Sequence, residues 1–163
     1  MATTERNVSQ GSASLYSGAL MEHVTNPDHH EELARSCCSH EGVNPSCGDD
    51  LTLSLELASD GTIADAAWQG TGCAVCQGSA DMACDAMLGR TPAEAAEVCH
   101  LFGEMVRGEV SDPAALEPLD EAASLVSVAH MPARVKCAEL AWRTLEEMLA
   151  DGEPANVAAP RLR

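Results

Sequence analysis

Three cysteines and one aspartate occupy the positions of this 163-residue chain where metal or sulfur chemistry could take place. Cys47 and Asp49 lie in the run Asn44-Pro45-Ser46-Cys47-Gly48-Asp49, Cys73 ends Gly70-Thr71-Gly72-Cys73, and Cys137 lies near the start of the last predicted helix. Thiolates and carboxylates are ligands of tetrahedral zinc sites. We therefore predict a metal site formed by these four side chains, with a purely structural zinc site as the alternative to a reactive one.

A predicted β-hairpin would bring two of these cysteines together. Strict alternation of apolar and polar residues from Leu51 to Leu57 predicts a strand, Ser59-Asp60-Gly61 predicts a turn, and Thr62 to Gln69 predicts the returning strand. Cys47 and Cys73 are each 13 residues from Asp60 (60 − 47 = 73 − 60 = 13). Antiparallel pairing is therefore expected to place them side by side at the open end of the hairpin, with Asp49 close by.

Cys137 is the favoured fourth ligand. It is expected near the N-terminus of the last helix, where the helix dipole and free N–H groups stabilise a thiolate. Arg134 and Lys136 lie beside it, and Lys136 is the only lysine of the chain. We expect these two basic residues to lower the pKa of Cys137 and to help receive an anionic sulfur species.

The other five cysteines receive weaker functional interpretations. Cys73-Ala74-Val75-Cys76 has the spacing of a redox pair, but it lacks the proline and aromatic residues usual around such pairs. Cys76 is expected to be buried, with ligand exchange or resolution of a persulfide as the alternative. Cys84 and Cys99 lie in helical runs rich in Ala and Val, and we predict that both are buried core residues.

Two further groups of potential ligands lie between residues 26 and 46, a segment predicted to be mostly loop. Cys37-Cys38 with His40 could bind a metal, although we favour an incidental pairing of the two cysteines. His29-His30 is expected to be a solvated pair.

The elements that must position these residues indicate an α+β fold. A small antiparallel sheet of about three strands is expected to pack against helices, because strand periodicity precedes helical periodicity along the chain. A third, short strand is expected near the end of the loop segment. Helices are expected over residues 15–24, 73–88, 91–107, 119–128 and 134–150, with a break at Met131-Pro132. We predict one domain over residues 15–150, with flexible tails at 1–14 and 151–163.

The charge of the chain limits the possible partners. Nine Lys and Arg against 26 Asp and Glu give a formal net charge of −17. Phosphates would be repelled by most of this surface, so we expect no nucleic-acid partner and no membrane partner. The N-terminal residues lack the apolar segment of a secretory signal, and no run of residues is apolar enough to span a membrane. We therefore expect a cytoplasmic protein whose cysteines are largely reduced.

Taken in order, these motifs resemble those of the IscU/NifU N-terminal family of iron–sulfur cluster assembly proteins. The resemblance covers residues 15–150 and rests on Leu15-Tyr16, His23, Asn26-Pro27, the Cys47-Gly48-Asp49 and Gly70-Thr71-Gly72-Cys73 motifs and Met131–Cys137. Within the family the chain is most similar to the SufU branch. The step from Cys73 to Cys137 spans 64 residues (137 − 73), longer than in IscU-type members. In addition, Lys136 stands where IscU-type proteins have a histidine, and their chaperone-binding motif is absent.

The resemblance implies an IscU/SufU-like fold and a zinc ion bound by Cys47, Asp49, Cys73 and Cys137. It also implies that Cys47 accepts persulfide sulfur from a SufS-type cysteine desulfurase and passes it to a SufBCD-type assembly complex. Such a protein is a zinc-dependent sulfurtransferase. One alternative is a scaffold that assembles a transient 2Fe–2S cluster, or binds iron, on the same ligands. A second alternative is a non-catalytic zinc module that only binds partners. The chain departs from the family pattern at Asp28-His29-His30, where relatives usually carry a basic residue. This acidic replacement could alter how a partner protein docks.

Overall fold

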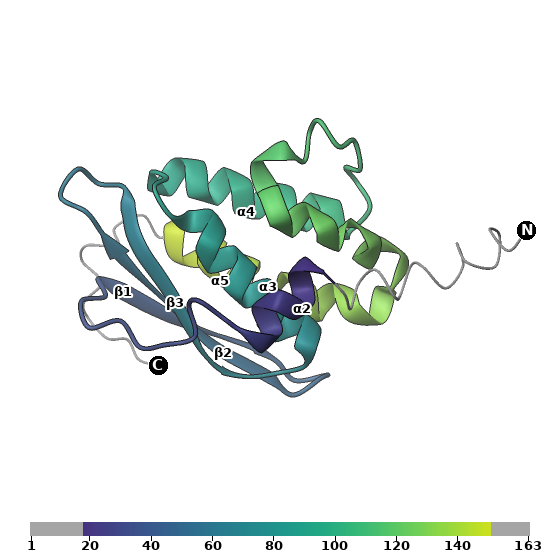
Figure 1. Ribbon diagram of the computed structural model, residues 1–163, viewed down its shortest axis with the longest axis horizontal. Helices are drawn as coiled ribbons and strands as arrows, with labels where there is room; N and C mark the ends of the chain where they lie inside the picture. The colour runs from purple at the N-terminus through teal and green to yellow at the C-terminus, as the bar shows by residue number, and fades with distance from the viewer. Residues whose placement is uncertain (1–17, 151–163) are drawn as a thin grey trace, which may run out of the picture.

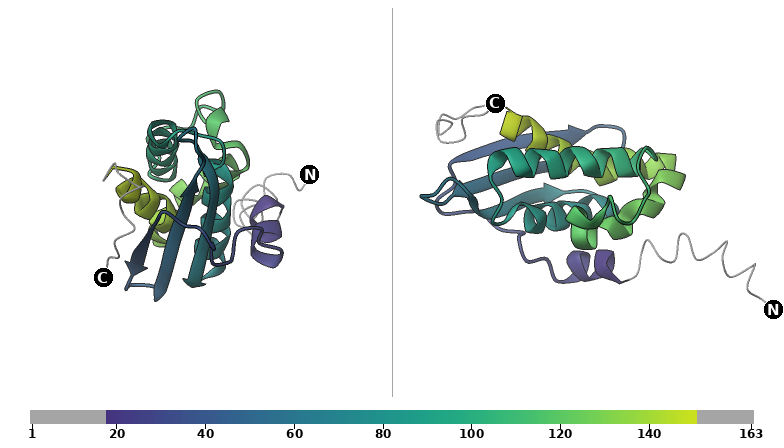
Figure 2. Two further views of the ribbon diagram at one scale, coloured as in Figure 1. Left: turned by 90° about the vertical axis from the view of Figure 1, so that its left-hand side faces the viewer. Right: turned by 90° about the horizontal axis from the view of Figure 1, so that it is seen from above.

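One antiparallel sheet and a set of helices on one of its faces form the molecule, in a computed structural model that describes residues 18–150 (Figures 1 and 2). The strands β1 (Cys38–Asn44), β2 (Asp49–Leu57) and β3 (Ile63–Thr71) are adjacent in chain order. The helices are α2 (Ala19–Thr25), α3 (Ala74–Met87), α4 (Pro92–Val106), the 3-10 helix η1 (Glu117–His130) and α5 (Pro132–Ala150). The predicted α+β class and the three-stranded sheet are confirmed.

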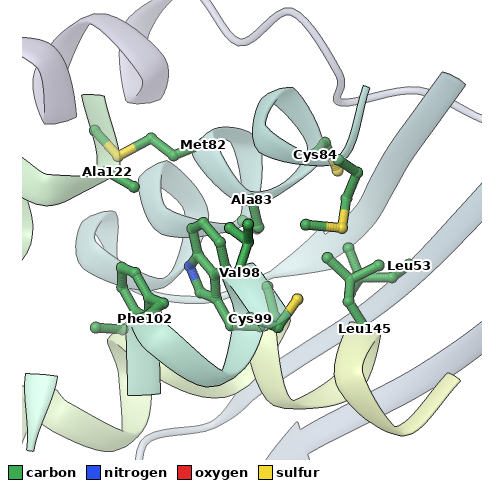
Figure 3. Packing of buried hydrophobic residues seen from close by; sticks show 14 of the residues in the cluster. Leu53, Met82, Ala83, Cys84, Val98, Cys99, Phe102, Ala122 and Leu145 are labelled. Atoms are coloured by element: carbon green, nitrogen blue, oxygen red, sulfur yellow. The ribbon is translucent and has the colours of Figure 1, made fainter. Parts of the chain in front are cut away.

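The hydrophobic core lies between the sheet and the helices α3 and α5. Leu51, Leu53 and Leu55 of β2 all point into it and are fully buried, as the alternating pattern predicts. Leu145 of α5 lies opposite Leu53 (Figure 3). Among the described residues, Cys84 and Cys99 are buried in this core, which confirms the prediction for both.

The ends of the helices follow from local sequence. Thr91 and Glu94 form a capping box at the start of α4, in which each side chain accepts a hydrogen bond from the other residue's backbone N–H. The helix α5 begins at Pro132, two residues before the predicted start at Arg134. The break at Met131-Pro132 is therefore the start of this helix, because a proline at the first helical position has no N–H to leave unpaired.

Other boundaries differ in detail. The short strand expected near the end of the loop segment is β1, and the helix predicted over 119–128 is the longer η1. A kink with Asp120 at φ 53° interrupts η1. The predicted helix over 15–24 begins at Ala19 in the described part, while residues 15–17 and the predicted tails at 1–14 and 151–163 lie outside it. Between residues 18 and 150, no helix has the length and apolar character needed to cross a membrane.

Candidate metal centre

The predicted ligands come from three places that meet at one end of the sheet. Cys47 is exposed in the turn between β1 and β2, and Asp49 is the buried first residue of β2. Cys73 is the N-cap residue of α3, and Cys137 is fully buried near the start of α5. The turn is closed by the backbone N–H groups of Cys47 and Gly48, which both donate to the carbonyl oxygen of Asn44 at 3.2 and 3.0 Å.

Three of the four predicted ligand atoms lie together. The donor atoms of Cys47, Asp49 and Cys137 all lie within 4.8 Å of one another, the only such group of three or more in the described part of the chain. The Sγ atoms of Cys47 and Cys137 are 3.4 Å apart. Two sulfur ligands about 2.3 Å from a tetrahedral zinc ion would be about 3.8 Å apart, so a small shift suffices to fit the ion.

Cys73 lies beside this group without belonging to it. Its backbone N–H donates to Oδ1 of Asp49 at 3.2 Å, and its thiol is close enough to Cys137 to raise the pKa of that residue. The structure thus brings the ends of the hairpin together as predicted. The donor set of three thiols and one carboxylate is suitable for zinc and, equally, for the thiolate ligation that iron–sulfur clusters use.

The pKa of the Cys137 thiol is raised, not lowered. Burial is the largest cause, and the side chains of Cys47, Asp49 and Cys73 add to it. The prediction that the half-buried Arg134 and the exposed Lys136 lower this pKa is therefore wrong. Because burial and the neighbouring side chains oppose ionisation of Cys137, a divalent cation is a group that would stabilise its thiolate form.

Asn44, the last residue of β1, was missed as a site residue by the sequence analysis. Its side chain is buried, and Nδ2 donates to Oδ2 of Asp49 at 3.2 Å and to Sγ of Cys137 at 3.9 Å. Both carboxylate oxygens of Asp49 therefore have donors, since Oδ1 accepts from the backbone N–H of Cys73. The only signal in the sequence was the position of Asn44 at the start of the motif that contains Cys47.

The remaining cysteines near the site do not join it. Cys76 is fully buried as expected, and its pKa is raised by burial and by the charges of Asp49, Cys73 and Cys47. A buried thiol with a raised pKa is a poor nucleophile. At the far end of β1, the Sγ atoms of Cys37 and Cys38 are 3.5 Å apart, and burial followed by the neighbouring Cys37 raises the pKa of Cys38 to about 12.

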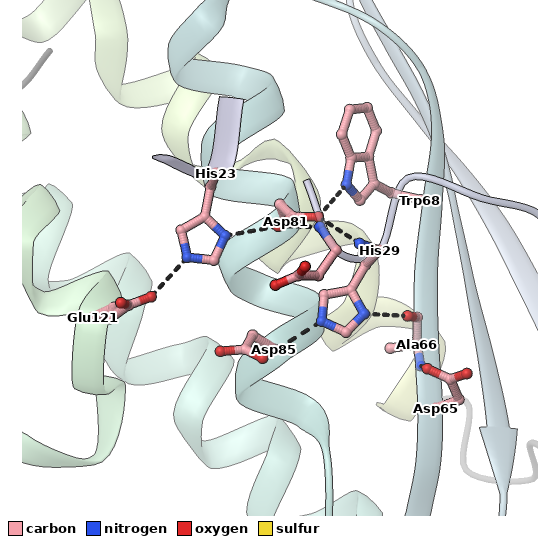
Figure 4. Close-up of polar contacts among 9 residues, drawn as sticks. His23, His29, Asp65, Ala66, Trp68, Asp81, Asp85 and Glu121 are labelled. Carbon is pink, nitrogen blue, oxygen red and sulfur yellow. Dashed lines mark hydrogen bonds and ion pairs between the residues drawn. The ribbon is translucent and has the colours of Figure 1, made fainter. Parts of the chain in front are cut away.

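A second buried polar cluster surrounds Asp81 on α3 (Figure 4). Its carboxylate accepts hydrogen bonds from Nδ1 of His23 at 2.7 Å, Nε1 of Trp68 at 3.0 Å and the backbone N–H groups of Asp28 and His29 at 3.1 and 2.9 Å. The other ring nitrogen of His23 lies 2.7 Å from Oε1 of Glu121 on η1. We call His23, His29, Trp68, Asp81 and Glu121 the Asp81 cluster.

The prediction of a solvated His29-His30 pair is wrong for His29, whereas His30 is exposed as predicted. His29 is buried, and its Nδ1 donates to the carbonyl oxygen of Ala66 at 3.1 Å. The ring of His30 stacks on Trp68 with 4.0 Å between the ring centroids. His30 forms a β-bridge with Trp68 of β3, and the backbone N–H of His29 donates to the buried Asp81. These two contacts fix the segment in the fold.

Comparison with known proteins identifies relatives over most of the chain. The family described as NifU-like N terminal domain matches residues 15–138. The chain is 37% identical to the iron–sulfur cluster assembly scaffold protein IscU of Streptococcus pyogenes serotype M1, over 83% of this chain and 82% of the relative. It is 33% identical to the zinc-dependent sulfurtransferase SufU of Bacillus subtilis strain 168, over 87% and 94% of the two chains.

A solved structure gives the same result. The crystal structure of FiSufU from Fervidobacterium islandicum AW-1, a candidate scaffold protein of the SUF system, has a TM-score of 0.72 and 31% sequence identity to this chain. The likeness covers 85% of this chain and 98% of the other. The chain belongs to the NifU-like N-terminal domain family, whose members named above are iron–sulfur cluster assembly proteins of the IscU and SufU types.

Proposed function

We propose that this protein is a cytoplasmic zinc-dependent sulfurtransferase of iron–sulfur cluster assembly. In this proposal Cys47, Asp49, Cys73 and Cys137 bind zinc, and Cys47 accepts sulfur from a SufS-type cysteine desulfurase and delivers it to a SufBCD-type complex. The observation that carries the proposal is the contrast in exposure within the cluster. Cys47 is exposed in a turn, whereas Asp49 and Cys137 are both fully buried beside it.

The chemistry needs a thiolate that is protected until a partner arrives. A bound zinc ion would hold the Cys47 sulfur deprotonated without redox chemistry of its own. Once released, the Cys47 thiolate attacks the outer sulfur of the enzyme persulfide, E–S–SH. The S–S bond of that persulfide breaks, E–S⁻ leaves with the electron pair, and Cys47–S–SH forms. Exposure of Cys47 allows this approach, while a buried thiol such as Cys137 is closed to it.

Arg134 and Lys136 have a supporting role in the proposal. They lie one turn before Cys137 and next to it in α5, in a protein with a net charge of −17. Positive charge here would favour the anionic persulfide over its neutral form. Because the pKa of Cys137 is raised in spite of these residues, we assign them to the incoming sulfur and not to activation of that thiol.

A scaffold function is the second candidate. The same ligands could bind iron or a transient 2Fe–2S cluster, and the Streptococcus pyogenes relative is named as a scaffold. Lys136 stands immediately before Cys137, where IscU-type proteins supply a histidine ligand, and this favours sulfur transfer over cluster assembly. Visible absorbance after reconstitution with iron and sulfide, followed by transfer to an apo-acceptor, would support the scaffold function.

The deciding experiment combines metal analysis with a desulfurase assay. We expect one zinc per chain in protein purified without added iron, and stimulation of a SufS-type desulfurase that Cys47→Ala reduces to background. Cys37→Ala is the matched control, because Cys37 is a partly exposed thiol at the other end of β1, and it should stimulate normally. Stoichiometric zinc together with full stimulation by Cys47→Ala would overturn the proposal. Persulfide on Cys47 after desulfurase treatment would exclude a zinc module that only binds partners.

A further inference from the structure

The candidate ligands are not held equally. Cys47 lies in a turn that is fixed through its backbone, and its exposed thiol accepts a hydrogen bond from Cys137 at 3.4 Å. Asp49 and Cys137 are fully buried and share a donor, the side-chain amide of Asn44. A ligand exchange at this site therefore involves one exposed member, Cys47, and two buried members that are held by the same amide group.

The position of Asn44 accounts for this sharing. It ends β1 and is paired with Asp49 at the start of β2, so its side chain faces the cluster from the opposite strand. Its amide nitrogen has two N–H donors, and the two acceptors that it meets are a carboxylate oxygen and a sulfur atom. Because neither acceptor could donate to an amide oxygen when ionised, the amide must present its nitrogen to them.

We propose that Asn44 is a positioning residue that keeps Asp49 and Cys137 in place as ligands while Cys47 leaves the metal. This inference rests on the proposed function. A hydrogen bond donated to an ionised ligand stabilises the charged form and fixes its direction, and loss of such a donor typically weakens metal binding about 10- to 100-fold. Asn44 gives this support to two buried ligands and gives none to the exposed Cys47. The asymmetry selects which sulfur is released.

The backbone and the side chain of Asn44 have separable roles. Its carbonyl oxygen accepts the N–H groups of Cys47 and Gly48 and so closes the turn. Asn44→Ala keeps that carbonyl and removes both side-chain donors. Asn44→Asp keeps the shape of the side chain, removes the donors and adds a negative charge beside Asp49. Because both substitutions remove the side-chain donors, both should weaken zinc binding.

The test measures zinc affinity by chelator competition, and the alkylation of each cysteine in the zinc-loaded protein by mass spectrometry. In the unmodified chain we expect Cys47 to react first and Cys137 to be protected. In Asn44→Ala we expect zinc affinity to fall about 10- to 100-fold and Cys137 to react at a rate approaching that of Cys47. A shifted absorption spectrum of the cobalt-loaded variant should report the changed ligand geometry. Asn26→Ala, at an exposed asparagine just after α2, is the matched control and should change nothing.

Cys84 and Cys99 are internal controls for unfolding, because both are buried in the core away from the cluster. If Asn44→Ala only loosened the fold, these two cysteines would become reactive together with Cys137, and the inference would be overturned. Unchanged zinc affinity with continued protection of Cys137 in a folded variant would also overturn it. If Asn44→Ala does not fold, Asn44→Asp provides the same readouts. Failure of the unmodified chain to bind zinc would instead reject the proposed function itself.

Discussion

Two buried aspartates, Asp49 and Asp81, organise two polar clusters in this protein, and the clusters differ in what surrounds them. Both side chains are fully buried. Asp81 faces the imidazole of His23, the indole of Trp68 and two backbone N–H groups. Asp49 faces one amide, one backbone N–H group and a set of thiols.

The charge balance of the two clusters is opposite. Burial opposes the ionisation of Asp81, but hydrogen bonds from His23, Trp68 and the backbone lower its pKa. Burial also opposes protonation of His23, yet hydrogen bonds to Glu121 and Asp81 and the charges of both raise its pKa. In the Asp81 cluster, the carboxylates of Asp81 and Glu121 thus have the imidazole of His23 as their partner within the protein. Around Asp49, by contrast, burial and then the side chains of Cys47, Asp49 and Cys73 raise the pKa of Cys137, so a cation would stabilise its thiolate. The comparison separates a cluster that stabilises the fold from one suited to bind and react.

The largest expected effect is loss of stability on removal of Asp81. Asp81→Ala leaves the buried imidazole of His23 and the indole N–H of Trp68 without their shared acceptor. Breaking a buried ion pair by removing one partner costs about 3–5 kcal/mol of the free energy of unfolding. Urea denaturation of the zinc-free proteins measures this difference.

The control for that variant lies one turn further along α3. Asp85→Ala removes a carboxylate whose side chain is 53% exposed and lies 3.5 Å from His29, so we expect a change below about 1 kcal/mol. Equal losses for Asp81→Ala and Asp85→Ala would contradict the structural role given to the Asp81 cluster. Zinc affinity should stay close to that of the unmodified chain in both variants.

The second prediction concerns zinc-dependent stability, which should depend only on the candidate ligands Cys47, Asp49, Cys73 and Cys137, here called the Asp49 cluster. Free zinc at 100 times its dissociation constant should raise the free energy of unfolding by about 2.7 kcal/mol. Cys137→Ser should abolish most of this increase, because it replaces a buried sulfur ligand with a weaker oxygen donor. Thermal unfolding with and without zinc measures the effect. A zinc-dependent increase that persists in Cys137→Ser would show that the metal binds elsewhere.

The sequence was sufficient to place Cys47, Asp49 and Cys73 of the Asp49 cluster because these residues come in local motifs, whereas Cys137, 90 positions from Cys47, was added from its position near the start of a helix. The turn around Cys47, the alternation of β2 and the glycines before Cys73 are all short-range signals. Equal spacing from Asp60 predicted the pairing of the hairpin to within one residue, the difference arising at the register shift between Glu56 and Leu57. The three-stranded sheet was predictable for the same reason. What these signals could not provide was the side-chain geometry, including the amide of Asn44 between Asp49 and Cys137.

The Asp81 cluster was not predictable because its members are distant in sequence. His23 and Asp81 are separated by 58 positions, and His23 and Glu121 by 98. Asp81 lies in an Ala- and Met-rich helix that also contains the exposed Asp85, and nothing in the sequence distinguishes the buried aspartate from a solvated one. The expectation of a solvated His29 failed for the same reason, since its burial depends on packing against α3 and β3.

The third prediction is a pH dependence of stability that comes from His23. Both ring nitrogens lie 2.7 Å from carboxylate oxygens, so the imidazolium form is required to donate at both. The pKa of His23 is raised in the folded protein. Its stabilising contribution is therefore fully present below the unfolded pKa of about 6.5 and is lost as the pH rises through the folded pKa.

Comparison of variants isolates this contribution. The difference in free energy of unfolding between the unmodified chain and His23→Gln should shrink as the pH rises above about 6.5. His100→Gln is the matched control, since the His100 side chain is 61% exposed and contacts Glu104 and Glu146 at 3.6 and 3.4 Å. A pH-independent difference for His23→Gln would mean that His23 is neutral in the fold.

The smallest effect is expected at the outer edge of the Asp81 cluster, in Glu121→Gln. The Glu121 side chain is 55% exposed, so loss of its charge should lower the free energy of unfolding by only about 0.2–1 kcal/mol. Because the hydrogen bond to Glu121 is the largest of the causes that raise the pKa of His23, the variant should also move the loss of stability to lower pH. Histidine titration by NMR in the variant measures this shift directly. An unchanged His23 titration would mean that Asp81 alone raises the pKa of His23 and that Glu121 of η1 has no part in it.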